Sequence, residues 1–527
     1  MSSTSNFASM SIIVEKDDSG QDIPCRSELE IASFLALVES KRKKGGGLFK
    51  KEAQKISFVS YVGWPFLILK KSDSNSHVVF DMLNFFSHKI DSEVIPDTDG
   101  FIENIRSQSV DSAYIAELKT HQETFKKFVG NIPHTIPAYM ESNELINDFI
   151  QQSKLSSIEN IGNFTYLLPS RLSDEQAIAS LDNIIKLKED AIVDFNKIIS
   201  AKDAVVRKSR EWNEFLEDEK RKTKDKYNSQ IDKLTPEVQT AVSRLQRDMS
   251  REIHSIDMSH SEKMTGYRSS LSKYQNDEIK HIQMGPTHQK SADIARHNKN
   301  GVLQQISQLE SETQNRKSKL RKYYDDQIQA QWQMIRSLEE NRDTQVNSLE
   351  MEQKEISEKT TLIDQKLSLL AVQKNQFIEK IEKMGVKIPT NLSSEFSDSP
   401  FLIYVPMLVA CLQTDKKPEW LVYPPMVFKK SKGLVDSFKG LMGGITLPLE
   451  SRTESLKILE KRFEEELEND VGLADELLTH CQKHDMLDNS EAKTKFSVGI
   501  EMIKEKKWLK DKHFQELKSG IESQFKT

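Results

Sequence analysis

The feature that most constrains this chain is the long stretch from Ser173 to Gly385, where apolar residues recur at alternating steps of three and four. This 3.5-residue spacing keeps one apolar stripe of a helix turned toward a partner helix, as in a coiled coil. The stripe comprises Leu181, Ile184, Ala191, Phe195, Ile198, Val205, Trp212 and Leu216 in a first arm, and Leu349, Ile356, Ile363, Leu367, Leu370, Phe377, Ile381 and Met384 in a last arm. The stretch therefore predicts two coiled-coil arms.

The segment Met284-Gly285-Pro286 lies between the arms and predicts a turn, because glycine and proline stop a helix. The arms then pair antiparallel, as a hairpin with its tip near residues 281–300. With Ala177 opposite Met384, the numbers of paired residues sum to 561, which places the turn near residue 280.

A second irregularity, Thr235-Pro236-Glu237, interrupts the first arm. Thr235 is a candidate N-cap, and Pro236 suits the first position of a new helix. The predicted partner of Pro236 lies in the Tyr323–Ile335 region, where the return arm also loses its heptad register. We therefore expect a two-arm hairpin with a shared joint at this level. A three-helix zigzag, with turns at both Pro236 and Gly285, is the alternative.

Two pairs of strands flank the coiled coil. Ile56–Leu69 and His77–Phe80 are rich in β-branched and aromatic residues, as are Phe401–Leu412 and Trp420–Tyr423, and each pair is joined by a polar turn. Because an isolated hairpin is marginally stable in water, we expect both hairpins to share one sheet. Pro65 interrupts the first strand and predicts an edge or a bulge there.

Helices are expected around this sheet. One begins at Arg26, another covers Phe101–Val129, and the pattern is helical from Ser451 onward, while Phe164–Pro169 is a candidate short strand. Ser173 followed by Gln176 resembles a capping box at the entrance to the coiled coil.

The predicted fold class is α+β. A small mixed head is built from N- and C-terminal β-hairpins and helices, and a long antiparallel coiled-coil hairpin is inserted between them. The predicted segments are a disordered lead over 1–25, the N-terminal half of the head over 26–172, the coiled-coil hairpin over 173–388, the C-terminal β-hairpin with a glycine-containing loop over 389–450, and a helical region over 451–527.

Composition agrees with a soluble cytoplasmic protein. The 527 residues carry a formal net charge of −6 and three widely separated cysteines, Cys25, Cys411 and Cys481. An odd, sparse set argues against a disulfide framework or a cysteine-based zinc site. No secretory signal is visible, and the most apolar windows are shorter than the ~20 residues that span a bilayer.

Motifs for catalysis are missing from the sequence. It contains no Gly-x-Ser-x-Gly elbow, His-Glu-x-x-His motif, Walker loop or dinucleotide fingerprint, so we expect no enzymatic activity, no catalytic residues and no cofactor. Two histidine groups are candidate metal ligands, but neither has a full set at ligand spacing, so exposed helix surface is the favoured interpretation. They are His254, His260, His281, His288 and His297 near the tip, and His480 with His484.

Two basic clusters are candidate contacts for nucleic acid, because lysine and arginine bind phosphates. For the first of them a solvated flexible linker is the favoured interpretation, because a single short cluster is not enough to indicate a phosphate-binding patch. The candidate residues are Lys41, Arg42, Lys43, Lys44, Lys50 and Lys51, followed near the C-terminus by Lys506, Lys507 and Lys510.

We expect a non-enzymatic structural or interaction protein that uses its coiled-coil arm as a spacer or assembly surface, with protein partners or self-association through that arm. A nucleic-acid-associated protein of chromosome-organisation type is the alternative. The third possibility is a scaffold attached to a membrane surface through Leu434–Ile445. The layout is similar to that of the long-armed chromosome-maintenance ATPases. Their nucleotide-binding motifs are absent here, so the resemblance covers the layout alone.

Overall fold

The computed structural model describes residues 7–9, 11–17, 20–44, 53–72, 76–127, 130–141, 144–148, 165–387, 400–413, 417–428, 447–509 and 511–526. The chain divides into two compact units. The first comprises Met1–Pro96, Phe128–Ile199 and Ser368–Thr527, and the second Asp97–Lys127 and Ser200–Leu367.

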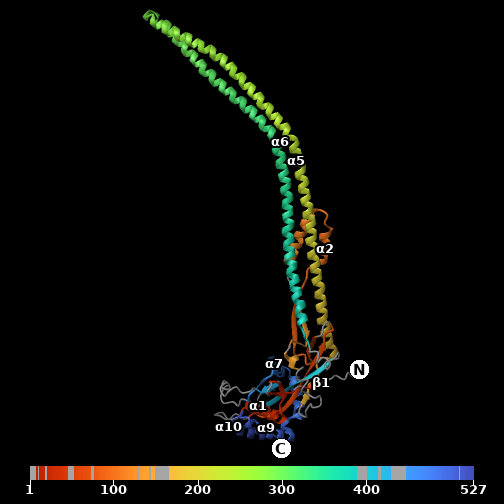
Figure 1. The fold of residues 1–527 in the computed structure, drawn as a ribbon. Helices are drawn as coiled ribbons and strands as arrows, with labels where there is room; N and C mark the ends of the chain where they lie inside the picture. The colour runs from red at the N-terminus through yellow and green to blue at the C-terminus, as the bar shows by residue number, and fades with distance from the viewer. Residues whose placement is uncertain are drawn as a thin grey trace. The chain divides into compact units, whose positions relative to one another are not determined.

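An eight-stranded sheet organises the first unit, and both predicted β-hairpins belong to it (Figure 1). Its main path runs β1-β11-β4-β5-β10, and β12, β8 and β9 pair with β11, β5 and β4 respectively. The bounds are β1 (Phe7–Ser9), β4 (Lys55–Lys70), β5 (Ser76–Asp81), β8 (Tyr139–Met140), β9 (Thr165–Leu167), β10 (Val386–Lys387), β11 (Phe401–Gln413) and β12 (Glu419–Tyr423). The first hairpin, β4 and β5, pairs with the second, β11 and β12, through antiparallel β4 and β11.

Pro65 lies in a central strand, so its prediction as an edge or bulge residue is wrong. It pairs with Tyr404 of β11 on one side. On the other side β9 ends opposite Gly63 and β5 begins opposite Phe66, so the missing N–H of Pro65 falls between two partner strands. The only register shift between β4 and β11 lies at Cys411/Leu412.

A second sheet, of order β14-β13-β2-β3, corrects the prediction of a disordered lead over residues 1–25. Its strands are β2 (Ile13–Lys16), β3 (Asp22–Pro24), β13 (Met426–Phe428) and β14 (Leu449–Ser451). Ile13 and Val14 are fully buried and pair with β13 from the far end of the chain. A local pattern of polar residues cannot reveal such a distant partner.

Helices cover both faces of the large sheet. Residues of β4 alternate between two cores: Val59 and Tyr61 pack with α1, α9 and α10, whereas Trp64 and Phe66 pack with α7 and α8. The helices are α1 (Ser27–Lys41), α7 (Glu454–Asn469), α8 (Val471–Cys481), α9 (Ser490–Glu505) and α10 (Asp511–Glu522), with short 3-10 turns η2 (Gln482–His484) and η3 (Met486–Asp488). The helical C-terminal region is thus several helices.

The predicted coiled-coil hairpin is confirmed. Helix α5 (Asp174–Gln283) and helix α6 (Gln289–Lys383) pack antiparallel, joined by Gly285 in a left-handed conformation (φ +88°) and η1 (Pro286–His288). The capping box is present: the Ser173 N–H donates to Gln176 Oε1 at 2.9 Å, and the Gln176 N–H donates to Ser173 Oγ at 3.3 Å. Because α5 continues through Pro236, the zigzag alternative is wrong.

The register of the hairpin differs from the predicted one. Asn213 faces Ser357 and Lys220 faces Glu350, so the numbers of paired residues sum to 570 rather than 561. A seam that repeats every seven residues permits a slip of about one heptad, because the same residue types meet again after it. The sequence pattern therefore predicts that the two arms pack antiparallel, but it does not predict which residues lie opposite one another.

This register predicts which engineered disulfide forms. With Cys25 replaced by serine, Asn213→Cys combined with Ser357→Cys is expected to cross-link on mild oxidation, because these side chains already touch at 3.5 Å. Non-reducing peptide mapping measures the yield. Asn213→Cys with Ser348→Cys, the pair that a sum of 561 requires, is the control; its preferential cross-linking would contradict the observed register.

The predicted helix Phe101–Val129 is two helices, α2 (Thr98–Ser107) and α3 (Asp111–Lys127), carried between β6 (Ser87–Glu93) and β7 (Asn131–Pro137). No residue between them is a proline or glycine, which is why the break was missed. Across the ranges that the structure describes, no helix is both long and apolar enough to span a membrane.

Candidate interaction surfaces of the long helices

The seam between α5 and α6 contains charge as well as apolar residues. Ile184, Ile198 and Val205 are fully buried. Lys374 also lies within the seam, 3% exposed, with its Nζ 2.8 Å from Asp194 Oδ2. A buried charge is stable only when its partner is in place, so this pair favours one alignment of the helices over its neighbours.

The end of α6 is held by the turn of the first β-hairpin. Lys71 is buried, and its ammonium donates to the carbonyl oxygens of Ile381 at 3.2 Å and Met384 at 3.4 Å. A cation at the C-terminus of a helix is favourable because the last carbonyls lack helical partners. Immediately after it, Gly385 turns the chain with φ +108° into β10. No local pattern predicts this role, because Lys71 belongs to a polar turn in the sequence.

In the second unit, helix α3 packs against α5. The Tyr114 hydroxyl lies 2.7 Å from Ser209 Oγ, which in turn lies 2.5 Å from Thr360 Oγ1 of α6, and the Tyr114 ring stacks on Trp212. Helix α3 is thus held against the side of the hairpin by the stacked rings of Tyr114 and Trp212 and by a series of buried hydroxyl groups.

The irregularity at Pro236 lies where the joint was predicted. Pro236 is inside α5, where it removes a helical hydrogen bond. Thr235 is not an N-cap, since its hydroxyl donates to the Ile231 carbonyl at 2.7 Å. Both long helices bend close to their labels in Figure 1. A proline inside a helix is a common cause of a kink, and α5 contains one at Pro236.

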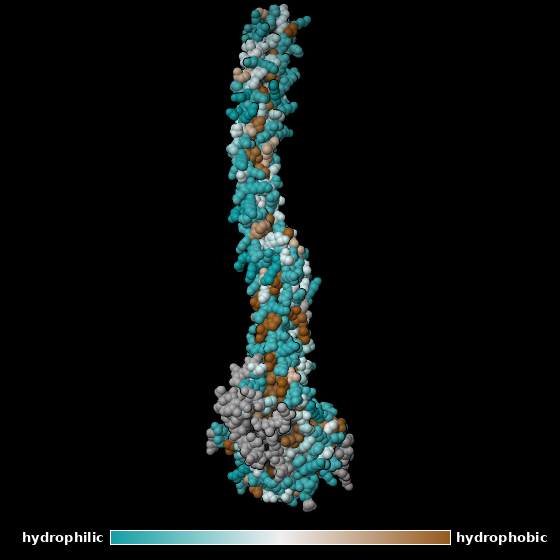
Figure 2. Space-filling view, turned by 90° about the vertical axis from the view of Figure 1, so that its right-hand side faces the viewer, coloured by the Kyte–Doolittle hydropathy of each residue, from teal (hydrophilic) through white to brown (hydrophobic). Residues whose placement is uncertain are grey.

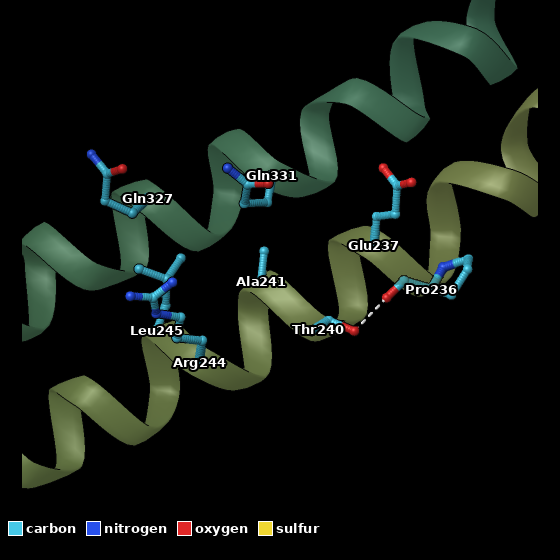
Figure 3. A pocket seen from close by; sticks show the side chains of 8 residues that line it. All are labelled: Pro236, Glu237, Thr240, Ala241, Arg244, Leu245, Gln327 and Gln331. Carbon is cyan, nitrogen blue, oxygen red and sulfur yellow. Dashed lines mark hydrogen bonds between the residues drawn. The ribbon is translucent and has the colours of Figure 1, made fainter.

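An open hollow of about 710 Å³ adjoins the joint (Figure 3). Gln327 and Gln331 of α6 line it from one side, both within the predicted Tyr323–Ile335 region, and residues of α5 such as Arg244 and Glu237 line it from the other. Amide, charged and small apolar side chains from both helices therefore line it together.

Several apolar residues are exposed near the tip of the hairpin, where α5 ends and α6 begins. Ile279, Ile282, Met284 and Ile294 are each at least half exposed. Of the tip histidines, His281 and His288 stack with ring centroids 6.1 Å apart. In the described residues no group of three or more histidine, cysteine or acidic side chains is placed to hold a metal ion.

The two residues of the other histidine group, His480 and His484, have different surroundings. The His480 ring stacks on Tyr166 at 4.7 Å, and the Tyr166 hydroxyl donates to Glu476 at 2.7 Å. His484 lies in the following 3-10 turn.

The basic clusters occupy opposite ends of α1. Lys41 is the last residue of that helix and Arg42 follows it. At the other end, Lys506 contacts Glu15, and the Glu15 carboxylate accepts a hydrogen bond from the Cys25 thiol just before α1. A helix of 15 residues is ~22 Å long, so the clusters do not form one patch. Lys50, Lys51 and Lys510 lie outside the described residues.

Carboxylates accompany several of these cations. Arg42 Nε lies 2.6 Å from Glu39, Lys43 Nζ 2.8 Å from Glu419 and Lys506 Nζ 3.3 Å from Glu15, and Lys44 lies 3.9 Å from Glu39. Lys41 and Lys507 are exposed, and neither forms an ion pair with another described residue.

A partly buried carboxyl group near the start of α1 titrates close to neutrality. Burial raises the pKa of Glu30 to about 7, although the Tyr61 hydroxyl donates to it at 2.8 Å. The unfolded chain has a pKa near 4.3 for this group, so ionising Glu30 disfavours the folded state. Stability is thus gained as the pH falls through about 7.

We expect the free energy of unfolding to increase by about 1 kcal/mol from this group between pH 8 and pH 6. Glu30→Gln keeps an acceptor for Tyr61 and removes the titration, so its pH profile should be flatter than that of the wild type. Urea unfolding at a series of pH values measures both profiles. Identical slopes would show that Glu30 does not titrate in this range.

Comparison with models of protein families finds no match, and neither the curated proteins nor the solved structures include a match to this chain. Function is therefore inferred from the surfaces themselves.

Proposed function

We propose that this chain is a non-enzymatic interaction protein whose helical hairpin is a spacer and an assembly surface. The observation that carries the proposal is the combination of a continuous buried seam with apolar side chains left exposed outside it. Ile192 and Val193 on α5, and Leu369 and Val372 on α6, are exposed although the seam beside them is closed. Exposed apolar groups at regular helical positions are typical of surfaces that bind another protein.

The spacer role follows from the length of the helices. At 1.5 Å per residue the 110 residues of α5 extend over ~165 Å. Apolar side chains reach the surface at intervals along the long helices, among mainly hydrophilic ones (Figure 2). Such a pair of helices offers several separate positions for partners.

Site-specific photo-cross-linking in the cells that make the protein tests this proposal. A photoreactive amino acid is placed singly at Ile192, Met334 or Ile282 of the long helices, and as matched controls at Ile458 or Val498, which are also exposed and apolar but lie on α7 and α9. We expect other proteins to be captured mainly from the long helices. Capture only from Ile458 and Val498, or from none of the positions, would contradict an assembly role.

Nucleic-acid association is the second candidate, and the exposure of Lys41 and Lys507 favours it. Its signature is a binding constant that falls steeply with salt and is lost on neutralising these two lysines. No binding at low salt would exclude it. The third candidate, membrane attachment through Leu434–Ile445, lies outside the described residues; liposome flotation with and without that segment tests it.

A further inference from the structure

One flank of the hairpin carries a regular apolar row beside the seam. On α5 the row consists of Ile178, Ile185, Ile192 and Ile199, seven residues apart, each following a buried seam residue by one position. Residues seven apart lie in a line along a coiled-coil helix, and this position flanks the seam. Ile178 is 40% exposed and Ile192 38%. Ile185 and Ile199 are partly buried, and Ile185 packs against the core that includes the seam residue Ile184. The row therefore lies beside the seam, with Ile178 and Ile192 as its exposed members.

Helix α6 also contributes apolar residues to this flank. Ala371 and Ile378 follow the seam residues Leu370 and Phe377 by one position, as the isoleucines do on α5. Lys188 Nζ lies 3.1 Å from Glu382, again a pair that sums to 570. In that register Ile192 stands level with Ile378, and Ile199 with Ala371. Ala371 and Ile378 are only 8% and 9% exposed, so they form the base of the flank, and Ile178 and Ile192 supply its exposed apolar surface. All of these residues lie within the first unit.

The outer rim of the flank is acidic on the α5 side. Glu175, Asp182 and Glu189 follow one another at the same seven-residue spacing and are exposed. Among described residues none of the three is in an ion pair, whereas on the α6 side Glu379 and Glu382 have lysine partners, Lys383 and Lys188. Lys186 is an exposed cation on the same stretch of α5. The α5 rim is therefore net negative.

We propose that this flank binds an amphipathic helix of another protein whose apolar stripe is bordered by lysine or arginine. Charge complementarity selects this occupant, because a second copy of the chain would oppose one acidic row to another. The row from Ile178 to Ile199 is ~32 Å long, which matches a helix of about 20 residues. The proposal rests on the proposed function and names the chemistry of one partner.

The test uses the full chain and a fluorescently labelled peptide of about 20 residues. The peptide has leucine at helical spacing, lysine and arginine beside that stripe, and alanine elsewhere; a second peptide carries glutamate in place of the basic residues. We expect anisotropy titrations to detect binding of the basic peptide and at least tenfold weaker binding of the acidic one. Equal binding of the two peptides would overturn the proposal.

Two substitutions locate the site. Ile192→Glu is expected to weaken binding of the basic peptide at least tenfold, whereas Ile294→Glu, at an exposed isoleucine near the tip, leaves it unchanged. Circular dichroism checks that both variants keep their helix content. Equal affinities of the two variants, or no binding by the wild type, would place the partner elsewhere.

The charge of the rim is tested by reversal. Asp182→Lys with Glu189→Lys is expected to transfer the preference to the acidic peptide; an unchanged preference would contradict the role of the rim.

A dimer in sedimentation that Ile192→Glu dissociates would mean that a second copy occupies the flank, which also overturns the proposal. If photo-cross-links arise only at Met334 or Ile282, this inference fails while the proposed function stands; if no cross-link arises from the long helices, both fail.

Discussion

Replacing Gly499 by alanine is expected to destabilise the first unit by about 3 kcal/mol or more. Gly499 lies in the middle of α9, where that helix crosses α1. A Cβ at this position would stand 1.9 Å from the carbonyl oxygen of Glu28 and 2.8 Å from Ala32 Cβ. Both neighbours are fixed by the α1 helix, so the two helices must separate to admit the methyl group, and the buried residues between them lose their contacts.

Hydrogen exchange of α1 and α9 at increasing urea concentration measures this loss locally, which matters because the two units need not unfold together. Gly301→Ala is the matched control. Gly301 is also inside a helix, but a Cβ there meets nothing within 4 Å, so alanine should stabilise by about 0.5–1 kcal/mol through its higher helix propensity. Equal exchange in Gly499→Ala and wild type would show that α1 and α9 do not pack this closely.

Gly385→Ala is expected to loosen the attachment of α6 to the sheet, at a cost of about 3 kcal/mol. Two effects add. The residue has φ +108°, which an L-amino acid with a side chain rarely adopts, and its Cβ would lie 2.8 Å from the carbonyl oxygen of His77. His77 pairs with Val386 in the sheet, so relieving the contact breaks β10 away from β5. Thermal unfolding and exchange of the 381–387 region measure the effect.

Gly285→Ala separates these two effects. Gly285 has a similar conformation, φ +88°, but a Cβ there meets nothing within 4 Å. Only the backbone strain remains, so the expected cost is about 1–2 kcal/mol. Equal costs at both glycines would mean that the contact with His77 contributes nothing.

Features encoded by neighbouring residues could be predicted from the sequence. The heptad seam, the stop at Gly285-Pro286 and the capping box of Ser173 and Gln176 depend on spacings of a few residues, and the structure contains all three. The sharing of one sheet by both β-hairpins also follows from a general requirement, since neither is stable alone.

Features that depend on distant partners could not be predicted. The slip of the hairpin register is invisible in a seven-residue repeat. Pro65 is tolerated in a central strand because of where β9 and β5 happen to end. The strand that contains Ile13 and Val14 needs β13, which is encoded some four hundred residues later.

The same distinction between local patterns and distant partners applies to the candidate interaction surfaces. The isoleucine row from Ile178 to Ile199 is present in the sequence, but whether its flank is open depends on the register and on what packs beside it. Conversely, Arg42 and Lys43 resemble a free basic cluster in the sequence, and the structure pairs them with Glu39 and Glu419. Lys71 could not be assigned to the end of α6, because only the fold brings that helix back to it.

Small-angle scattering from the monomeric full chain tests most directly whether α5 and α6 form an extended arm. A paired hairpin with a bend at Pro236 should give a maximum dimension of about 150 Å or more, set by the length of α5 alone. A compact particle with a maximum dimension below about 100 Å would contradict the hairpin arm and with it the spacer role.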